Sequence, residues 1–158
     1  MDDNKSKALA AALAQIEKQF GKGSVMRMDD SDVIEDIQSV STGSLGLDIA
    51  LGINGIPKQA GKIIEMYGWE SSGKSTLAQT IIANFQKAGQ KCLLVDAENS
   101  LDDKYAKSLG IDLENLYLIQ LDESAGEGAY NKMERLVQTG EIGLVVIDSY
   151  NALQPLKI

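Results

Sequence analysis

The chain has 158 residues, 44% of them apolar and 24% charged, which suits one globular domain with a sizeable core. No apolar run approaches a membrane span and the charged N-terminus is unlike a signal peptide, so we expect a cytoplasmic protein with no membrane partner. The net charge of −8, with only two arginines, argues against nucleic-acid binding by these residues, and the lack of histidine excludes histidine catalysis.

The first 36 residues are expected to form an arm that precedes the core. Residues 4–20 predict an amphipathic helix that ends at glycines 21 and 23, and a short extended run over Ser24–Met28 follows. The apolar stripe of this helix recurs at spacings of four, three and four residues: Leu9, Leu13, Ile16 and Phe20. The arm is too small to bury this stripe alone, so it either folds back on the core or docks on a neighbouring subunit.

Residues 37–158 are expected to form an α/β core. A short helix at Leu45–Leu51 and a loop to Gly61 come first, and strands then alternate with helices. The strands are expected at Lys62–Tyr67, Lys91–Asp96, Leu116–Leu121 and Gly143–Asp148. The helices between them are expected at 74–89, Asp102–Leu109 and Ala125–Thr139. Strands that are apolar throughout, such as Leu144–Ile147, indicate a parallel sheet with helices on both faces.

A glycine-rich pattern of the form G-x-x-x-x-G-K-[ST] lies between the first expected strand and its helix. This glycine loop is followed by Thr76 and consists of eight residues: Gly68, Trp69, Glu70, Ser71, Ser72, Gly73, Lys74 and Ser75. The glycines let successive N–H groups turn toward one anion, and the helix adds its dipole. Lys74 can reach the β- and γ-phosphates, and the Ser75 hydroxyl can ligate Mg²⁺. The pattern predicts nucleoside triphosphate binding, the alternative being a chance glycine turn.

Carboxylates follow two of the expected strands, at the edge where ligands of such sheets bind. Asp148 ends an apolar strand, which is the pattern of an aspartate that holds Mg²⁺ through water. Glu98 can orient or deprotonate a water that attacks the γ-phosphate, with Asp96 as the other candidate. The alternatives are a structural aspartate at a strand end and a solvated loop glutamate. Tyr105 is placed either to stack on a base or simply to pack.

Taken together, these motifs resemble the bacterial RecA recombinase family over residues 5–153. The resemblance rests on the glycine loop, Asp96–Glu98, Leu101–Asp102 with Tyr105, Val146–Ser149, and the leading residues 7–24 and 41–52. It implies a P-loop NTPase core of the RecA type, with ATP and Mg²⁺ as cofactors and DNA-dependent ATP hydrolysis. It also implies a filament that coats single-stranded DNA, pairs homologous sequences and exchanges strands in recombination and DNA repair.

The resemblance also implies roles for single residues. They are phosphate binding by Lys74, Mg²⁺ binding by Ser75 and Asp148 (the latter through water), water activation by Glu98, and adenine contact by Asp102 and Tyr105. Residues 5–28 match the arm that docks on the next subunit, which favours a homo-oligomer over an arm folded on its own core.

Several positions depart from the family pattern. Trp69 replaces the usual proline of the glycine loop, Asn99 replaces the usual histidine after the glutamate, and Tyr150 replaces a small apolar residue. Family members also continue beyond the last expected strand, with DNA-binding loops and a strand that lies between those at Lys62–Tyr67 and Gly143–Asp148. We therefore expect the N-terminal part of a recombinase with an incomplete core. Alone, it should neither bind single-stranded DNA specifically nor hydrolyse ATP appreciably.

Two other functions stay open. The first is a nucleotide-dependent module that docks on a full-length recombinase filament and modulates it. The second is a small-molecule kinase with the same glycine loop. Kinases usually bring several arginines to the transferred phosphate, and Arg27 and Arg135 both lie far from the loop in sequence, which weakens the second reading.

Overall fold

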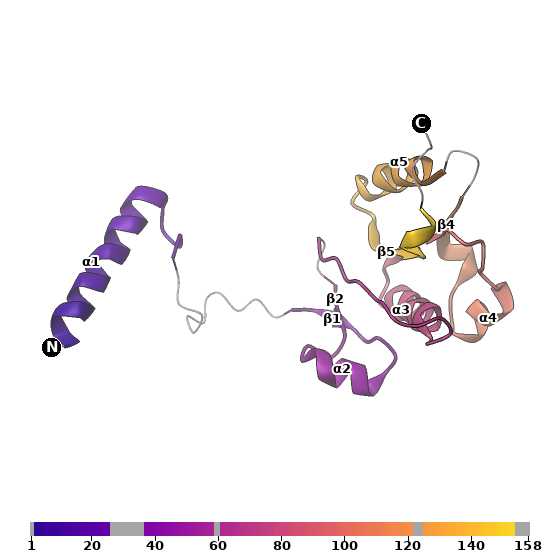
Figure 1. Ribbon diagram of the computed structural model, residues 1–158, viewed down its shortest axis with the longest axis horizontal. Helices are drawn as coiled ribbons and strands as arrows, with labels where there is room; N and C mark the ends of the chain where they lie inside the picture. Colours follow the sequence, from indigo (N-terminus) through magenta and orange to yellow (C-terminus); the bar gives the residue numbers. More distant parts are fainter. Residues whose placement is uncertain (1, 26–36, 59–60, 122–124, 154–158) are drawn as a thin grey trace. The chain divides into compact units, whose positions relative to one another are not determined.

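The computed structural model describes residues 2–25, 37–58, 61–121 and 125–153. They fall into two compact units, Met1–Asp36 and Ile37–Ile158, each of which is described by itself (Figure 1). Every described strand belongs to the second unit. No described helix has both the length and the apolar character that crossing a bilayer requires.

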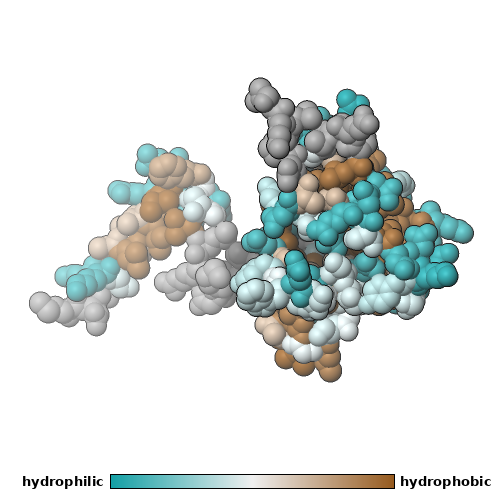
Figure 2. Space-filling model, turned by 45° about the vertical axis from the view of Figure 1, so that its right-hand side comes forward, coloured by the Kyte–Doolittle hydropathy of each residue, from teal (hydrophilic) through white to brown (hydrophobic). Residues whose placement is uncertain are grey.

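Helix α1 spans Asp2–Phe20 and confirms the helix predicted near the N-terminus. It ends at Gly21, whose φ of 100° strains any other residue and whose N–H donates to the Glu17 carbonyl oxygen at 3.0 Å. The apolar stripe is accessible, since Leu9 is 57% exposed and Phe20 is 69% exposed. Figure 2 shows hydrophobic atoms along this helix. Most of the extended run predicted at 24–28 lies outside the described residues.

The core of the second unit is a three-stranded parallel sheet in the order β4-β3-β5. The strands are β3 (Lys91–Asp96), β4 (Leu116–Gln120) and β5 (Ile142–Asp148). They agree with three of the four predicted strands, with bounds that differ by a residue at most. Asp96 is in register with both Gln120 and Asp148, so the carboxyl ends of all three strands meet at one edge. This edge carries the acids that the sequence singled out.

Helices cover both faces of the sheet, as the apolar strands predicted (Figure 1). The helical elements around it are α3 (Lys74–Lys87), α4 (Asp103–Ser108), α5 (Ala125–Val137) and the short 3₁₀ turns η1 (Leu113–Asn115) and η2 (Tyr150–Ala152). Leu94 packs in one cluster with Phe85 of α3, whereas its neighbour Val95 packs in the other with Ala129 of α5. Alternate β3 side chains therefore serve two cores, and each large one contributes about 1.5–3 kcal/mol by burial. The α/β prediction is confirmed.

A small antiparallel pair precedes the sheet, and its second strand lies within the loop that was expected before Gly61. Strand β1 (Ser39–Val40) pairs with β2 (Ile56–Pro57), and α2 (Leu45–Leu51) lies between them in the chain. The pair forms because Gly55 can approach the Val40 carbonyl group, which a side chain at position 55 would strike.

The loop between β1 and α2 is fixed by the buried Asp48. Its carboxylate accepts hydrogen bonds from Ser41 Oγ at 2.6 Å, Thr42 Oγ1 at 2.6 Å and the Thr42 N–H at 2.9 Å. These bonds hold the pKa of Asp48 below its ordinary value, the bond from Ser41 being the main cause. Asn84 of α3 donates to the Ser41 carbonyl oxygen at 2.9 Å, which ties this loop to the helix of the glycine loop.

The prediction of a strand at Lys62–Tyr67 is wrong for this structure. The segment has no strand pairing, and its apolar residues face solvent, with Ile63 97% exposed. A strand needs a neighbour to satisfy its N–H and C=O groups. None of the described strands pairs with this segment. Strand β5 is an edge strand of the sheet and, among the described residues, pairs only with β3. The apolar residues therefore indicated a strand, but the described part of the chain provides no neighbouring strand for it to pair with.

Candidate nucleotide-binding site

The glycine loop closes on the side chain of its own lysine. The Lys74 ammonium group donates to the carbonyl oxygens of Gly68 at 3.1 Å and Trp69 at 2.9 Å. The Ser72 N–H donates to the Trp69 carbonyl oxygen at 3.3 Å and turns the loop. Lys74 thus lies within the loop, where a positive charge and main-chain groups converge. The binding of an anion by the N–H groups of this loop stays a prediction.

Backbone conformation explains why the loop needs a glycine before α3. Gly73 is the N-cap of α3 with φ of 92°, a conformation that is strained for residues with a side chain. As glycine, it offers no side-chain acceptor to the first-turn N–H groups of α3, and the helix dipole adds partial positive charge there. Ser71 also has a positive φ, of 58°. The start of α3 is therefore open to an acceptor that carries negative charge.

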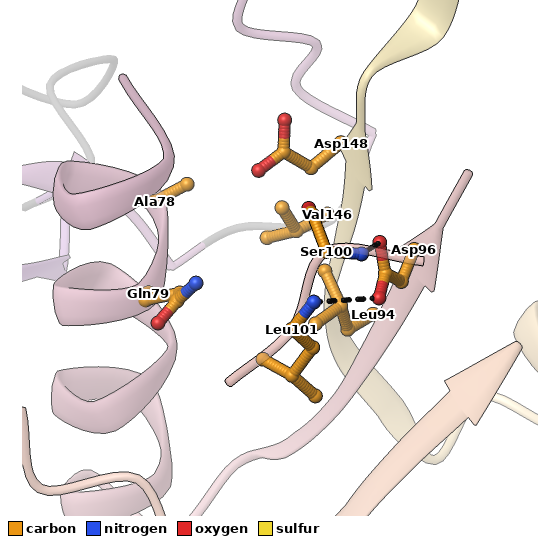
Figure 3. A pocket seen from close by; sticks show the side chains of 8 residues that line it. All are labelled: Ala78, Gln79, Leu94, Asp96, Ser100, Leu101, Val146 and Asp148. Carbon is orange, nitrogen blue, oxygen red and sulfur yellow. Dashed lines mark hydrogen bonds between the residues drawn. The ribbon is translucent and has the colours of Figure 1, made fainter. Parts of the chain in front are cut away.

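A small pocket lies between α3 and the carboxyl ends of β3 and β5 (Figure 3). Its lining consists of Ala78, Gln79, Leu94, Asp96, Ser100, Leu101, Val146 and Asp148. Figure 3 shows Asp148 at the end of β5 on the side of the pocket nearest the start of α3. The Gln79 side-chain oxygen is buried without a hydrogen-bond partner, so the pocket has an acceptor available to a water molecule. Asp148 and α3 therefore line the same small pocket.

Asp96 binds backbone groups of the loop that follows β3. Its carboxylate accepts from the Ser100 N–H and the Leu101 N–H, each at 3.0 Å, and the residue is buried (Figure 3). A carboxylate that satisfies two loop N–H groups fixes the loop after β3. The sequence offered Asp96 as the alternative to Glu98. In the structure Asp96 shapes the loop that carries Glu98, a role that sequence reasoning missed.

Glu98 lies on that loop, exposed, and is joined to the strand end of β5. Its Oε1 atom accepts a hydrogen bond from Ser149 Oγ at 2.5 Å. The Ala97 N–H donates to the Asp148 carbonyl oxygen at 2.8 Å, which brings the two strand ends together just before this contact. Sequence reasoning singled out Glu98 and Asp148 but not Ser149. No local pattern could have shown that the serine bonds to the glutamate, since 51 positions separate them.

Tyr105 and Asp102 occupy the start of α4. Asp102 is the N-cap of this helix, and its carboxylate accepts from the Tyr105 N–H at 2.9 Å. The Tyr105 hydroxyl lies 3.0 Å from Thr76 Oγ1, on the first turn of α3. The structure therefore brings Tyr105 to the helix of the glycine loop, and the Asp102 carboxylate caps α4; contact of either residue with adenine stays a prediction.

The predicted site forms two groups in this structure. In the first group, among the described residues, Lys74 donates hydrogen bonds to carbonyl oxygens of its own loop. In the second, Asp96 and Glu98 accept hydrogen bonds at the ends of β3 and β5. Ser75 is exposed on the first turn of α3, between the two groups in the chain. Cys92 takes no part, because burial raises the pKa of its thiol to about 11 and keeps it a packing residue.

The fold and the site define an α/β protein with a lysine-bearing glycine loop beside strand-end acids. The family model described as the RecA N-terminal domain matches residues 7–157. The chain is 56% identical over 155 residues to Protein RecA of Azoarcus sp. (strain BH72) and to Protein RecA of Campylobacter fetus subsp. fetus (strain 82-40). The chain therefore belongs to the RecA N-terminal domain family, and the resemblance predicted from the sequence is confirmed.

The two relatives are longer than this chain. The matched region covers 98% of the chain but 44% of each relative. The chain thus spans less than half the length of the curated proteins it matches.

Proposed function

We propose that this chain binds ATP with Mg²⁺ and forms the nucleotide-binding part of a RecA-type, DNA-dependent ATPase. The observation that carries the proposal is the position of the Lys74 ammonium within the glycine loop, beside the first turn of α3. A triphosphate needs main-chain N–H donors and a cation, and the start of α3 offers both. Mg²⁺ prefers oxygen ligands, which the Ser75 hydroxyl and the Asp148 carboxylate supply. The donor set fits both groups.

Each side chain then has one task. Lys74 exchanges its loop carbonyl partners for the β- and γ-phosphates. Ser75 would hold Mg²⁺ directly and Asp148 would hold it through water. Glu98 accepts a proton from the attacking water, a step in which a well-placed base contributes roughly 10²–10⁴-fold to the rate. Tyr105 offers its ring to adenine from the start of α4, beside Asp102. Bound Mg²⁺ neutralises charge on the phosphates.

The wider function that fits this site is that of a DNA recombinase. Membership in the RecA N-terminal domain family supports a role in homologous recombination and DNA repair on single-stranded DNA. The exposed stripe of α1 supports docking of residues 5–28 on a second copy, which would build a filament. The cytoplasm fits the free Cys92, which remains reduced there.

The test uses a chimaera in which this chain replaces the matching residues of the Azoarcus relative. We expect the chimaera to hydrolyse ATP, faster with single-stranded DNA, and to exchange DNA strands. Glu98→Gln should bind ATP normally and hydrolyse it about 10²–10⁴-fold more slowly. The matched control is Glu127→Gln on α5, an exposed glutamate away from the site, which should leave turnover unchanged.

Two results would contradict different parts of the proposal. A chain that does not bind ATP contradicts the nucleotide site itself. If the chimaera binds ATP but single-stranded DNA does not change its rate of ATP hydrolysis, the recombinase assignment is contradicted. The 158-residue chain by itself should bind ATP and hydrolyse little of it. It should bind single-stranded DNA weakly, because its net charge of −8 repels a polyanion.

A further inference from the structure

A hydrogen bond joins Ser149 and Glu98, which lie just beyond the ends of β5 and β3. Ser149 Oγ donates to Glu98 Oε1 at 2.5 Å, within the range expected for a hydroxyl bound to a carboxylate. The two residues follow the register pair Asp96 and Asp148, each on its own strand end. The contact therefore bridges the edge of the sheet at which the nucleotide is proposed to react.

The backbone on both sides of Glu98 is held in place. The Ala97 N–H bonds the Asp148 carbonyl oxygen at 2.8 Å, and the Asp96 carboxylate bonds the Ser100 and Leu101 N–H groups at 3.0 Å each. With these anchors the main chain of the loop is fixed. The Glu98 side chain, however, is exposed and has three torsions of its own. Within the part of the chain that the structure describes, this side chain accepts a hydrogen bond from Ser149 and from no other residue.

We infer that Ser149 is a positioning residue for the Glu98 carboxylate. By holding Oε1, the hydroxyl selects one orientation of the side chain and leaves Oε2 free for the attacking water. Placement of this kind matters because a misplacement of about 1 Å can cost roughly 10²-fold in rate. This inference rests on the proposed function, in which Glu98 activates water. It assigns a task to the serine that follows Asp148, separate from the Mg²⁺ role of Asp148 itself.

The contact can be tested directly on the 158-residue chain. The probe is the side-chain carboxyl ¹³C resonance of Glu98, assigned by its disappearance in Glu98→Gln. Ser149→Ala should shift this resonance. Ser39→Ala should not, and it is a matched control because Ser39 is another half-buried serine, whose hydroxyl donates to the Ile53 carbonyl oxygen at 2.6 Å. If the chemical shift of the Glu98 carboxyl carbon is the same in Ser149→Ala as in the unsubstituted chain, the inference is wrong.

The consequence for turnover is tested in the chimaera. Ser149→Ala should lower kcat about 10–100-fold and change KM for ATP by less than about 2-fold, because placement of the base acts on the chemical step. Ser149→Thr keeps the hydroxyl and should recover most of the lost kcat. Ser39→Ala should retain full turnover. An unchanged kcat in Ser149→Ala, or a loss that Ser149→Thr does not recover, contradicts the inference.

A double substitution separates Ser149 from its neighbour Asp148. If Ser149 acts through Glu98, Ser149→Ala should cost less than about 2-fold in a Glu98→Gln background. An equal loss in both backgrounds shows a different route and overturns the inference. So does a raised Mg²⁺ requirement in Ser149→Ala, which would place its effect on Asp148. If the unsubstituted chimaera lacks DNA-stimulated hydrolysis, the proposed function fails first, and the inference about the base falls with it.

Discussion

The hydroxyl of Tyr105 and Oγ1 of Thr76 lie 3.0 Å apart, and this hydrogen bond joins the start of α4 to the first turn of α3. Two segments that are separate in the sequence, one beside the proposed phosphate site and one proposed to contact the base, are therefore linked through side chains. The link holds the tyrosine hydroxyl at the first turn of α3, while the residue stays 44% exposed.

Removal of the Tyr105 ring should weaken ATP binding without weakening triphosphate binding. In Tyr105→Ala the base loses a stacking partner, which is worth about 1–3 kcal/mol in comparable base–aromatic contacts. Calorimetry with ATP and with inorganic tripolyphosphate measures the two effects separately. Tyr117→Ala is the matched control, because Tyr117 on β4 is also 44% exposed. Equal losses for the two ligands would assign Tyr105 to packing.

The charge of Lys74 should be needed for nucleotide binding. Lys74→Ala removes the ammonium group from the glycine loop, and a hydrogen bond to a charged group contributes about 1.5–3 kcal/mol, or roughly 10–150-fold in Kd. Titration of a fluorescent ATP analogue measures the change. Lys87→Ala, at the other end of α3, is the control and should bind as tightly as the unsubstituted chain. If Lys74→Ala also binds the analogue as tightly as the unsubstituted chain, the assignment of Lys74 to phosphate binding is wrong.

Gly43 should resist substitution for reasons of space and backbone. Its φ is 87°, and a Cβ atom there would strike the Thr80 side chain of α3. Gly43→Ala should therefore lower the free energy of unfolding by about 1–3 kcal/mol. Urea denaturation followed by circular dichroism gives the value. Gly46 has no atom near its Cβ position and lies within α2, so Gly46→Ala should be neutral or stabilising.

Stability should fall in acid partly because of Asp48. Hydrogen bonds from Ser41 and Thr42 lower the pKa of Asp48 in the folded chain below its ordinary value of 3.8. The folded state therefore binds this proton less readily than the unfolded state does, so the stabilisation is present above pH 3.8 and is lost as the pH falls through the lower, folded value. Asp48→Asn should be less stable at neutral pH, and its stability should fall less steeply than that of the unsubstituted chain below about pH 4. Urea denaturation across this pH range compares the two chains, and parallel curves would contradict the prediction.

The stripe of α1 should act between copies of the protein. Leu13→Asp places a carboxylate among the apolar residues of the stripe, and burial of an unpaired charge costs several kcal/mol. In the chimaera, sedimentation should show small species in place of filaments, while ATP binding persists. Gln15→Asp, at an exposed position of the same helix, tests whether charge alone has this effect. Filaments that survive Leu13→Asp would contradict docking through the stripe.

The fold could be predicted well where the signal is local. The helical spacing of apolar residues predicted α3, and apolar runs that end in aspartate predicted β3 and β5. The glycine loop was evident because Gly73 and Lys74 stand at fixed positions before a helix. The same signal failed at Lys62–Tyr67, because hydrophobicity indicates a strand but cannot supply the neighbouring strand that completes it.

By itself, then, the sequence determined the α/β alternation, the glycine loop, the acids at the strand ends and membership in the family. Only the tertiary structure decided what each acid bonds to. Asp96 and Glu98 are two residues apart and chemically alike, yet one is buried on two loop N–H groups and the other is exposed and held by Ser149. The partner of a carboxylate depends on which donors the packing of distant strands brings within reach, and that information lies in no local pattern.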